Sequence, residues 1–372
     1  MTTSLDHLAR GRDNNLNLIR IVAAAMVLVS HSFVIASGNP HAEPWDAVLG
    51  RSPGGMAVDI FFVISGFLVS GSLVKQASIG PYLMARAVRI YPGLWVALLL
   101  TVLVVGWCAT SASPAAFFTD PQTWRYLLRN GTMVLGAEAV LPGAFEAQPF
   151  AGVVNGSLWT LRHELRLYLL LALAWWLLQR WAPGRALDRL KWLVTLAAVG
   201  LSALALWQLG ASDRSDLVRM GGMFFTGAAL HAWRQQVQLG GPRGLLMVAV
   251  ALLAMVAGAA VSPRVFEPVY RLAMPLVVCW MAFVPAGPWR AWNRLGDYSY
   301  GVYIYAFPVQ QLCLLAWPGL GPWGLTGVAG VITLALAVAS WYAVESPALE
   351  WLHRRRQRRQ AAAAAAAVTV AG

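Results

Sequence analysis

Two ionisable residues share one face of an apolar segment near the start of the chain. Arg20 and His31 lie in the segment NLNLIRIVAAAMVLVSHSFVIASG, eleven positions apart. In an α-helix this spacing is three turns plus about 20° of rotation, with a rise of about 16 Å. Such groups are costly in lipid and usually face a bundle interior or a water-filled cavity. The pair therefore predicts a polar track, in which a neutral His is a usable base near pH 7. A snorkelling Arg and a hydrogen-bonded His are the alternatives.

A second segment, GGMAVDIFFVISGFLVSGSL, carries Asp59 near one end and Ser65 beside Gly66 in its middle. Asp59 could pair with His31 and fix its tautomer. It could equally be an interfacial acid that caps the start of a helix. The small residues Ser65 and Gly66 indicate a close approach between helix backbones.

A basic pair occurs in the segment RAVRIYPGLW. Arg86 and Arg89 are three residues apart, on one helical face, and Pro92 suits an early helical position. Two forked guanidiniums suit a phosphate group. The spacing alone favours the simpler interpretation, a positively charged flank at the inner membrane surface.

Polar and aromatic residues mix in the segment NGSLWTLRHELRLYLL, which we expect at the outer mouth of the bundle. Trp159 beside Ser157 suits sugar binding. Because the chain has 18 Trp and this residue type is common in interfacial belts, the belt is the stronger interpretation. Glu164 could be a base or a partner for Arg162 or Arg166.

Two further segments lie near the end of the chain. Tyr300 and Tyr303, in LGDYSYGVYIYAFPVQQ, could line a cavity or belong to an interfacial belt. Glu345, in WYAVESPALEWL, lies near the inner end of the last apolar segment and could pair with an arginine.

Composition identifies the elements that must position these residues. The 372 residues are 58% hydrophobic and 12% charged, with a mean hydropathy of +0.59. The apolar runs are continuous and long enough to span a bilayer, which favours helices over a β-barrel. We predict an all-α polytopic membrane protein with about ten transmembrane helices, at 16–37, 56–75, 92–109, 165–181, 192–209, 217–232, 245–262, 269–285, 298–317 and 323–343.

The net charge of +12 is unevenly distributed. If both termini are cytoplasmic, the basic residues gather in the inner segments and the acidic ones in the outer loops, which is the positive-inside bias. This pattern predicts cytoplasmic termini and argues against a nucleic-acid partner. The three cysteines lie in apolar stretches without a CxxC motif, and we predict no metal site.

The chain divides into an integral-membrane domain, 1–352, and a tail, 353–372, that is basic and then Ala-rich. We expect a cytoplasmic, weakly ordered tail. The domain contains a long outer loop, 110–164, whose length indicates function or disorder, and whose aromatic residues predict packing at the outer membrane face. There is no internal repeat, which argues against transporters built on inverted repeats.

Several motifs, in order along the chain, resemble those of the membrane-bound acyltransferase-3 family, bacterial O-acyltransferases that modify surface or secreted glycans. They are the Arg20 and His31 pair, VDIFFVISGFLV (58–69), the Arg86 and Arg89 pair before Tyr91 and Pro92, SLWTLRHE (157–164), SYGVYIYAFP (299–308) and WYAVESP (341–347).

The resemblance implies ten helices in the bacterial inner membrane, acyl-CoA (most often acetyl-CoA) as the cytoplasmic donor, and an outer glycan or glycolipid hydroxyl as the acceptor. It implies functional importance for Arg20 and His31. It also implies a donor-binding role for Arg86 and Arg89, and it carries the acidic end of SLWTLRHE onto Glu164.

The mechanism expected from this resemblance places coenzyme A at the basic inner face, with its phosphates on Arg86 and Arg89. Arg20 would steer the pantetheine arm or polarise the thioester carbonyl. His31 would be the general base for the acceptor hydroxyl or would briefly take the acyl group, while Glu164 would orient the acceptor. The expected acceptor and cavity residues are Asp59, Ser65, Ser157, Trp159, Tyr300, Tyr303 and Glu345.

One position departs from the family pattern. Many members have a His before the aromatic-Pro step where this chain has Ala306, so any role of that His is absent or relocated. The rival interpretation is a transporter or flippase for a glycan precursor or a small anion, which uses the same polar cavity without chemistry. The sequence leaves open the acceptor glycan, the acyl group and the oligomeric state.

Overall fold

The computed structural model describes residues 3–11, 13–76, 78–133, 135–211 and 214–371, and its regular structure in these ranges is helical. The long helices are α2 (Leu16–Ser37), α4 (Pro53–Lys75), α5 (Ile79–Cys108), α8 (Trp159–Trp181), α9 (Ala186–Trp207), α10 (Asp216–Ala232), α11 (Gly241–Val261), α12 (Pro263–Phe283), α13 (Ser299–Ala316), α14 (Pro322–Ser340) and α15 (Ser346–Ala371). The shorter elements include α1 (Leu5–Leu8), α3 (Asp46–Leu49), α6 (Pro114–Thr119), α7 (Pro121–Thr132), the 3-10 helix η3 (Pro288–Arg294) and the π-helical turn η4 (Trp341–Glu345).

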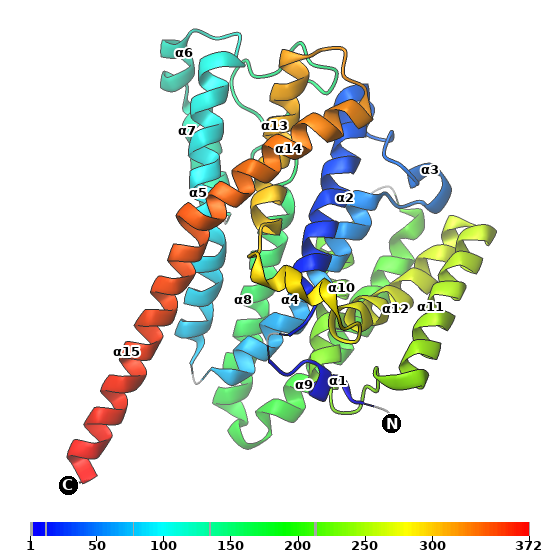
Figure 1. The fold of residues 1–372 in the computed structure, drawn as a ribbon, viewed down its shortest axis with the longest axis vertical. Helices are drawn as coiled ribbons and strands as arrows, with labels where there is room; N and C mark the ends of the chain where they lie inside the picture. Colours follow the sequence, from blue (N-terminus) through cyan, green and yellow to red (C-terminus); the bar gives the residue numbers. More distant parts are fainter. Residues whose placement is uncertain (1–2, 12, 77, 134, 212–213, 372) are drawn as a thin grey trace.

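The predicted all-α class is confirmed, and each of the ten predicted segments coincides with one helix from α2 to α14. Within the described ranges, seven helical stretches are long and apolar enough to cross a membrane. The count of ten spans and the membrane side of the termini stay predictions. Figure 1 shows α1 and the end of α15 toward the same end of the molecule.

Apolar side chains cover much of the outer surface of the bundle. Only 17% of the apolar window of α9, and the same share of that of α11, is buried. Leu196, Val199 and Leu253 are 68%, 64% and 68% exposed. Since soluble monomers rarely expose such contiguous apolar surface, these helices face lipid, and the chain is a multi-pass membrane protein.

The centre of the bundle is a close crossing of α4 and α10. A Cβ added to Gly66 would collide with the carbonyl oxygen of Phe224, and one added to Gly227 would collide with the carbonyl oxygen of Val63. Each helix therefore lacks a side chain where the backbone of the other lies, as small residues permit in membranes. The close approach predicted at Gly66 is confirmed.

Helix α5 begins at Ile79, well before the predicted start at residue 92. Pro92 is therefore interior, and the prediction of an early helical position for it was wrong. Pro92 lacks the N–H that would bond the carbonyl of Val88. Two residues before the proline, the carbonyl of Ile90 accepts a hydrogen bond from Tyr300 Oη at 2.7 Å, which joins α5 to α13. The early start brings Arg86 and Arg89 into the helix.

The long segment between α5 and α8 folds back along α5. Phe117, in α6, packs against Gly106, and Tyr91 Oη donates to the carbonyl of Thr132 at 3.0 Å. Between Gly106 and Tyr91 the returning chain covers about 22 Å of helix. Farther on, Gln311 Nε2 donates to the carbonyl of Val153 at 2.8 Å. The segment is therefore packed against both α5 and α13.

The end of the chain is helical, and the weak order that we expected of the tail stays a prediction. Helix α14 continues through η4 into α15, and the long helix projects past the other helices (Figure 1). The residues from 353 onward are mainly Arg, Gln and Ala, which are strong helix formers. The helix that begins in the bundle can therefore propagate without further packing.

The glycine crossing makes a first prediction. The Gly66→Ala variant should be destabilised by about 1–3 kcal/mol, because overpacking forces the backbones of α4 and α10 apart. The matched control is Gly200→Ala in α9, where a Cβ meets nothing within 4 Å. It should be neutral or stabilising by about 0.5–1 kcal/mol. Melting temperatures in detergent measure both, and equal values for the two variants would contradict the crossing.

Candidate functional site

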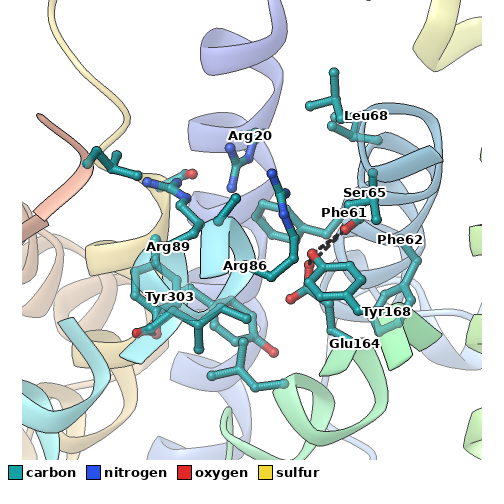
Figure 2. Close-up of a pocket in the computed structure, with 18 of the residues that line it drawn as sticks. Arg20, Phe61, Phe62, Ser65, Leu68, Arg86, Arg89, Glu164, Tyr168 and Tyr303 are labelled. Atoms are coloured by element: carbon teal, nitrogen blue, oxygen red, sulfur yellow. Dashed lines mark hydrogen bonds between the residues drawn. The ribbon is translucent and has the colours of Figure 1, made fainter. Parts of the chain in front are cut away.

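A cavity of about 650 Å³ lies between α2, α4, α5, α8, α13 and the start of α15. Figure 2 shows that three guanidinium groups from α2 and α5 gather on one side of it, with a hydroxyl and carboxylate cluster opposite. The predicted site residues that line this cavity are Arg20, Ser65, Arg86, Arg89, Glu164, Tyr300 and Tyr303.

Two of the three guanidiniums share one carboxylate. Asp297, in the turn before α13, accepts hydrogen bonds from Arg20 and from Arg89, and its other oxygen accepts one from Ser299 Oγ. Burial alone would raise the pKa of Asp297, but the two guanidiniums and the Ser299 donors hold this pKa below its usual value. Arg89 Nη1 also lies 3.7 Å from the carboxylate of Glu345. Arg20 and Arg89 are therefore fixed in place and largely neutralised.

The third guanidinium, on Arg86, has no carboxylate within ion-pair distance among the described residues. Its Nε is buried and has no hydrogen-bond partner, and its guanidinium lies 6.0 Å from the centre of the Tyr168 ring. Arg86 and Arg89 therefore differ: Arg89 is bound within the protein, while Arg86 is available to an anion or a carbonyl oxygen.

Glu164 lies in the same cavity as Arg86. Its Oε1 accepts hydrogen bonds from Ser65 Oγ at 2.8 Å and from Tyr168 Oη. No ion pair joins Glu164 to Arg162 or Arg166 among the described residues, so its predicted pairing with them was wrong, while its place at the outer mouth stays a prediction. The pairing is absent because α8 turns this side chain toward the middle of α4, where Ser65 and Tyr168 satisfy it.

Tyr300 and Tyr303 are buried and line the cavity, so the interfacial-belt alternative does not hold for them. Tyr303 Oη donates to the carbonyl of Ser157 at 2.9 Å and hydrogen bonds with Thr160 Oγ1. The Tyr303 ring packs against Phe61, with 5.9 Å between centroids. These contacts form the wall at one end of the cavity.

His31 lies beyond that wall and does not line the cavity. Its ring meets Phe307 edge-on, with 5.1 Å between centroids. Its Nδ1 is buried without a hydrogen-bond partner. Because Phe307 follows Tyr303 by four residues on α13, the two share a face and are about 6 Å apart along the axis. His31 therefore lies about one helical turn past the end of the cavity. The adjacent Ala306 is buried and supplies no polar group.

Asp59 belongs to a separate buried ion cluster. It is fully buried and accepts hydrogen bonds from Arg51, from Arg219 Nη1 at 3.3 Å and from Tyr270 Oη at 3.3 Å. Neither predicted role holds, because these cations occupy its oxygens in place of His31. The helix cap is also elsewhere, since Ser52 Oγ accepts from Gly55 N at 3.1 Å.

The remaining predicted residues lie around the cavity without lining it. Ser157 is buried with a free Oγ. Trp159 packs edge-on against His163, with 5.8 Å between centroids. Glu345 is buried, accepts from Ser340 Oγ at 3.1 Å and approaches Arg89, as its predicted pairing with an arginine requires.

Asp297 is the residue that sequence reasoning missed. It stands in LGDYSYG, a short turn without periodicity, and its partner Arg20 is 277 positions away. One sequence signal could have identified Asp297: it is an acidic residue directly before an apolar segment, on a side of the bundle where arginines dominate. Tyr168 and Thr160 were also missed, because nothing in their spacing separates them from packing residues. Among the described residues, no cluster of three or more His, Cys, Asp or Glu is placed to hold a metal ion.

Comparisons with known proteins agree with this geometry. A family model described as an acyltransferase domain, of the acyltransferase-3 type, matches residues 13–342. The chain is 30% identical to a protein of Shigella phage Sf6 named O-acetyl transferase, over 90% of this chain and 95% of the relative. It is also 30% identical to nodulation protein 10 of Rhizobium leguminosarum bv. viciae, over 94% of this chain and 96% of the relative. No solved structure matches the chain at a significant level.

The shared carboxylate makes a second prediction. Asp297→Asn leaves Arg20 without a carboxylate partner and Arg89 with Glu345 alone, and should cost about 3–5 kcal/mol of stability. Since the pKa of Asp297 is lowered on folding, this contribution is complete above the unfolded value of about 4 and is lost as the pH falls through the folded value. Thermal unfolding in detergent at pH 7 measures the loss.

The matched control is Asp13→Asn. The Asp13 side chain is 74% exposed and pairs with Arg290 at 2.6 Å, so its removal should cost about 0–1 kcal/mol. If both variants unfold at the same temperature, Asp297 does not hold the two arginines in place.

Proposed function

This chain belongs to the acyltransferase-3 family, and we propose that it moves an acetyl group from cytoplasmic acetyl-CoA to a hydroxyl of an extracytoplasmic glycan, across the bacterial inner membrane. The family makes it an O-acyltransferase enzyme. The observation that carries the finer proposal is the cavity itself, where the unpaired Arg86 faces a space lined by Arg20, Arg89 and Glu164. The name of the phage relative supports acetyl as the group transferred.

The donor is proposed to place its thioester end in this cavity. Arg86 has hydrogen-bond donors that the described residues leave unused, so it can bind a carbonyl or phosphate oxygen of the donor. Arg20 and Arg89 are held by Asp297 and shape the cavity, while the unpaired charge of Arg86 stabilises developing negative charge on the thioester oxygen. In this proposal Arg89 is a positioning residue, and it acts through its ion pairs with Asp297 and Glu345.

The chemical step is attack of the acceptor hydroxyl on the thioester carbonyl carbon. A C–O bond forms, the C–S bond breaks, and coenzyme A leaves as the thiolate. His31 takes the hydroxyl proton as general base, and the thiolate takes a proton from the imidazolium or from water. The buried Nδ1 of His31 has no partner among the described residues, so no carboxylate fixes its tautomer.

The acceptor is proposed to approach from the side of His31. Tyr303, which lines the donor cavity, and Phe307, which contacts His31, lie one turn apart on α13 between that side and the donor cavity. Rotation of these rings would join the two sides without a shift of a helix. Under the rival transporter interpretation the cavity passes a solute unchanged, so consumption of acetyl-CoA separates the two functions.

A third prediction concerns the base. His31→Ala should lower acetyl transfer by about 10²–10⁴-fold, the usual contribution of general acid–base catalysis. The measurement is transfer of radiolabelled acetyl from acetyl-CoA to envelope glycan in membranes that contain equal amounts of each variant. The control is His41→Ala, whose side chain is 84% exposed in a loop and which should leave the rate unchanged. Full activity of the His31 variant would remove it from the mechanism.

A fourth prediction concerns the donor. Arg86→Gln should weaken acetyl-CoA binding by about ten- to a hundredfold, since hydrogen bonds to charged groups contribute about 1.5–3 kcal/mol. Equilibrium binding of acetyl-CoA to the purified protein in nanodiscs measures this. The control is Arg243→Gln on α11, which is exposed and lines neither the cavity nor its entrance. Unchanged affinity in the Arg86 variant would rule out donor binding at this residue.

A further inference from the structure

A second and larger cavity opens at the end of the molecule that carries α1. Its volume is about 1230 Å³, and it lies between α1, the C-terminal ends of α4 and α10, the start of α5, and α15. Leu68, Leu352 and Arg356 line both this cavity and the first one. The two cavities are therefore neighbours with a common wall, and together they follow α4 for about 27 Å.

The second cavity has far more positive charge than the described residues neutralise. Its one acidic lining residue, Asp6, already bonds Arg10 at 2.9 Å and Arg234 at 2.7 Å, one through each carboxylate oxygen. The basic lining residues without a carboxylate partner in the described part of the chain are Lys75, Arg355, Arg356 and Arg359.

These four cations come from two elements that converge. Lys75 ends α4, and the three arginines project from within five consecutive positions of α15. Arg356 Nη2 donates to the carbonyl of Pro81 at 2.8 Å, which ties α15 to the start of α5 and places Arg356 at the common wall. A multiply charged phosphate compound fits such a cluster, because each charge-assisted bond can be satisfied separately.

We propose that this basic cavity binds the adenosine phosphate end of coenzyme A. This inference rests on the proposed function, and it changes where the nucleotide phosphates of the donor are bound. Arg86 and Arg89 do not hold the nucleotide phosphates; Lys75 and the arginines of α15 do. The pantetheine arm passes Leu68 and Leu352, and the thioester reaches Arg86 and Arg20 in the first cavity. The C-terminal helix is thus part of the donor site.

The test uses the full chain in phosphatidylcholine nanodiscs and measures equilibrium affinities for acetyl-CoA, S-acetylpantetheine and adenosine 3′,5′-bisphosphate. The variant combines Lys75→Gln, Arg355→Gln, Arg356→Gln and Arg359→Gln. It should bind acetyl-CoA and the bisphosphate at least about tenfold more weakly, while its affinity for S-acetylpantetheine stays unchanged. Retained S-acetylpantetheine binding also shows that the variant is folded.

The matched control is Arg354→Gln with Arg358→Gln, which removes charge from the same helix at positions that do not line the cavity. It should bind all three compounds like the original protein. If the fourfold variant is poorly folded, Lys75→Gln alone and competition of the bisphosphate against acetyl-CoA on the unaltered protein make the same test.

Each negative result of the binding test leads to a different conclusion. If the unaltered protein binds acetyl-CoA and the fourfold variant binds it equally well, this proposal is overturned and the proposed function stands. If the unaltered protein binds no acetyl-CoA, both are overturned. An anionic lipid headgroup has the same phosphate chemistry. If variant and original differ only in nanodiscs that contain phosphatidylglycerol, and the bisphosphate never competes, the cavity holds lipid and the proposal is wrong.

Discussion

The carboxylate of Asp297 is the interaction on which the rest of the site depends. A guanidinium in a low-dielectric interior costs several kcal/mol unless it is paired, and α2 and α5 each bring one to the same place. Asp297 accepts from both, and Ser299 completes its hydrogen bonds. Three helices that are far apart in sequence are therefore joined at one point. Because Asp297 and Glu345 neutralise Arg20 and Arg89, the positive charge left for a ligand is concentrated on Arg86.

A second set of buried charges fixes the start of α4. Arg51 binds Asp59 and forms a two-pronged pair with Glu267, and Arg271 Nε lies 2.7 Å from the same Glu267. Breaking such pairs is costly even where forming them gains little, so the set favours one arrangement of α4 and α12. Farther along α4, the glycine crossing fixes this helix against α10. The side of the first cavity that α4 forms is therefore held at two points.

The sequence predicted the helices well, because long apolar runs have few alternative structures in a membrane. Through the family resemblance, the sequence also grouped Arg20, Arg86 and Arg89 as donor-side residues, and all three line the first cavity. It failed where a partner lies far along the chain. Asp59 was assigned to His31 or to a helix cap, whereas its partners are Arg51, in the loop before α4, and Arg219 and Tyr270, which are 160 and 211 positions away. Helical periodicity holds no information on which distant turn supplies a counter-charge.

The position of His31 constrains how an acyl group could cross the membrane. Along α2, His31 stands about 16 Å from Arg20, but the donor cavity ends near Tyr303, about one turn of α13 short of the Phe307 ring that contacts His31. A donor confined to the first cavity would bring its thioester close to His31 without reaching it. The remaining gap is lined by the buried aromatic side chains of Tyr303 and Phe307. If the nucleotide end is held in the basic cavity, the donor is anchored at its far end. Its flexible arm can then cross that gap while both ionic clusters stay intact. With this geometry the enzyme needs no alternating access. The distance that the acyl group can cover is set by the length of the donor and the depth of the basic cavity.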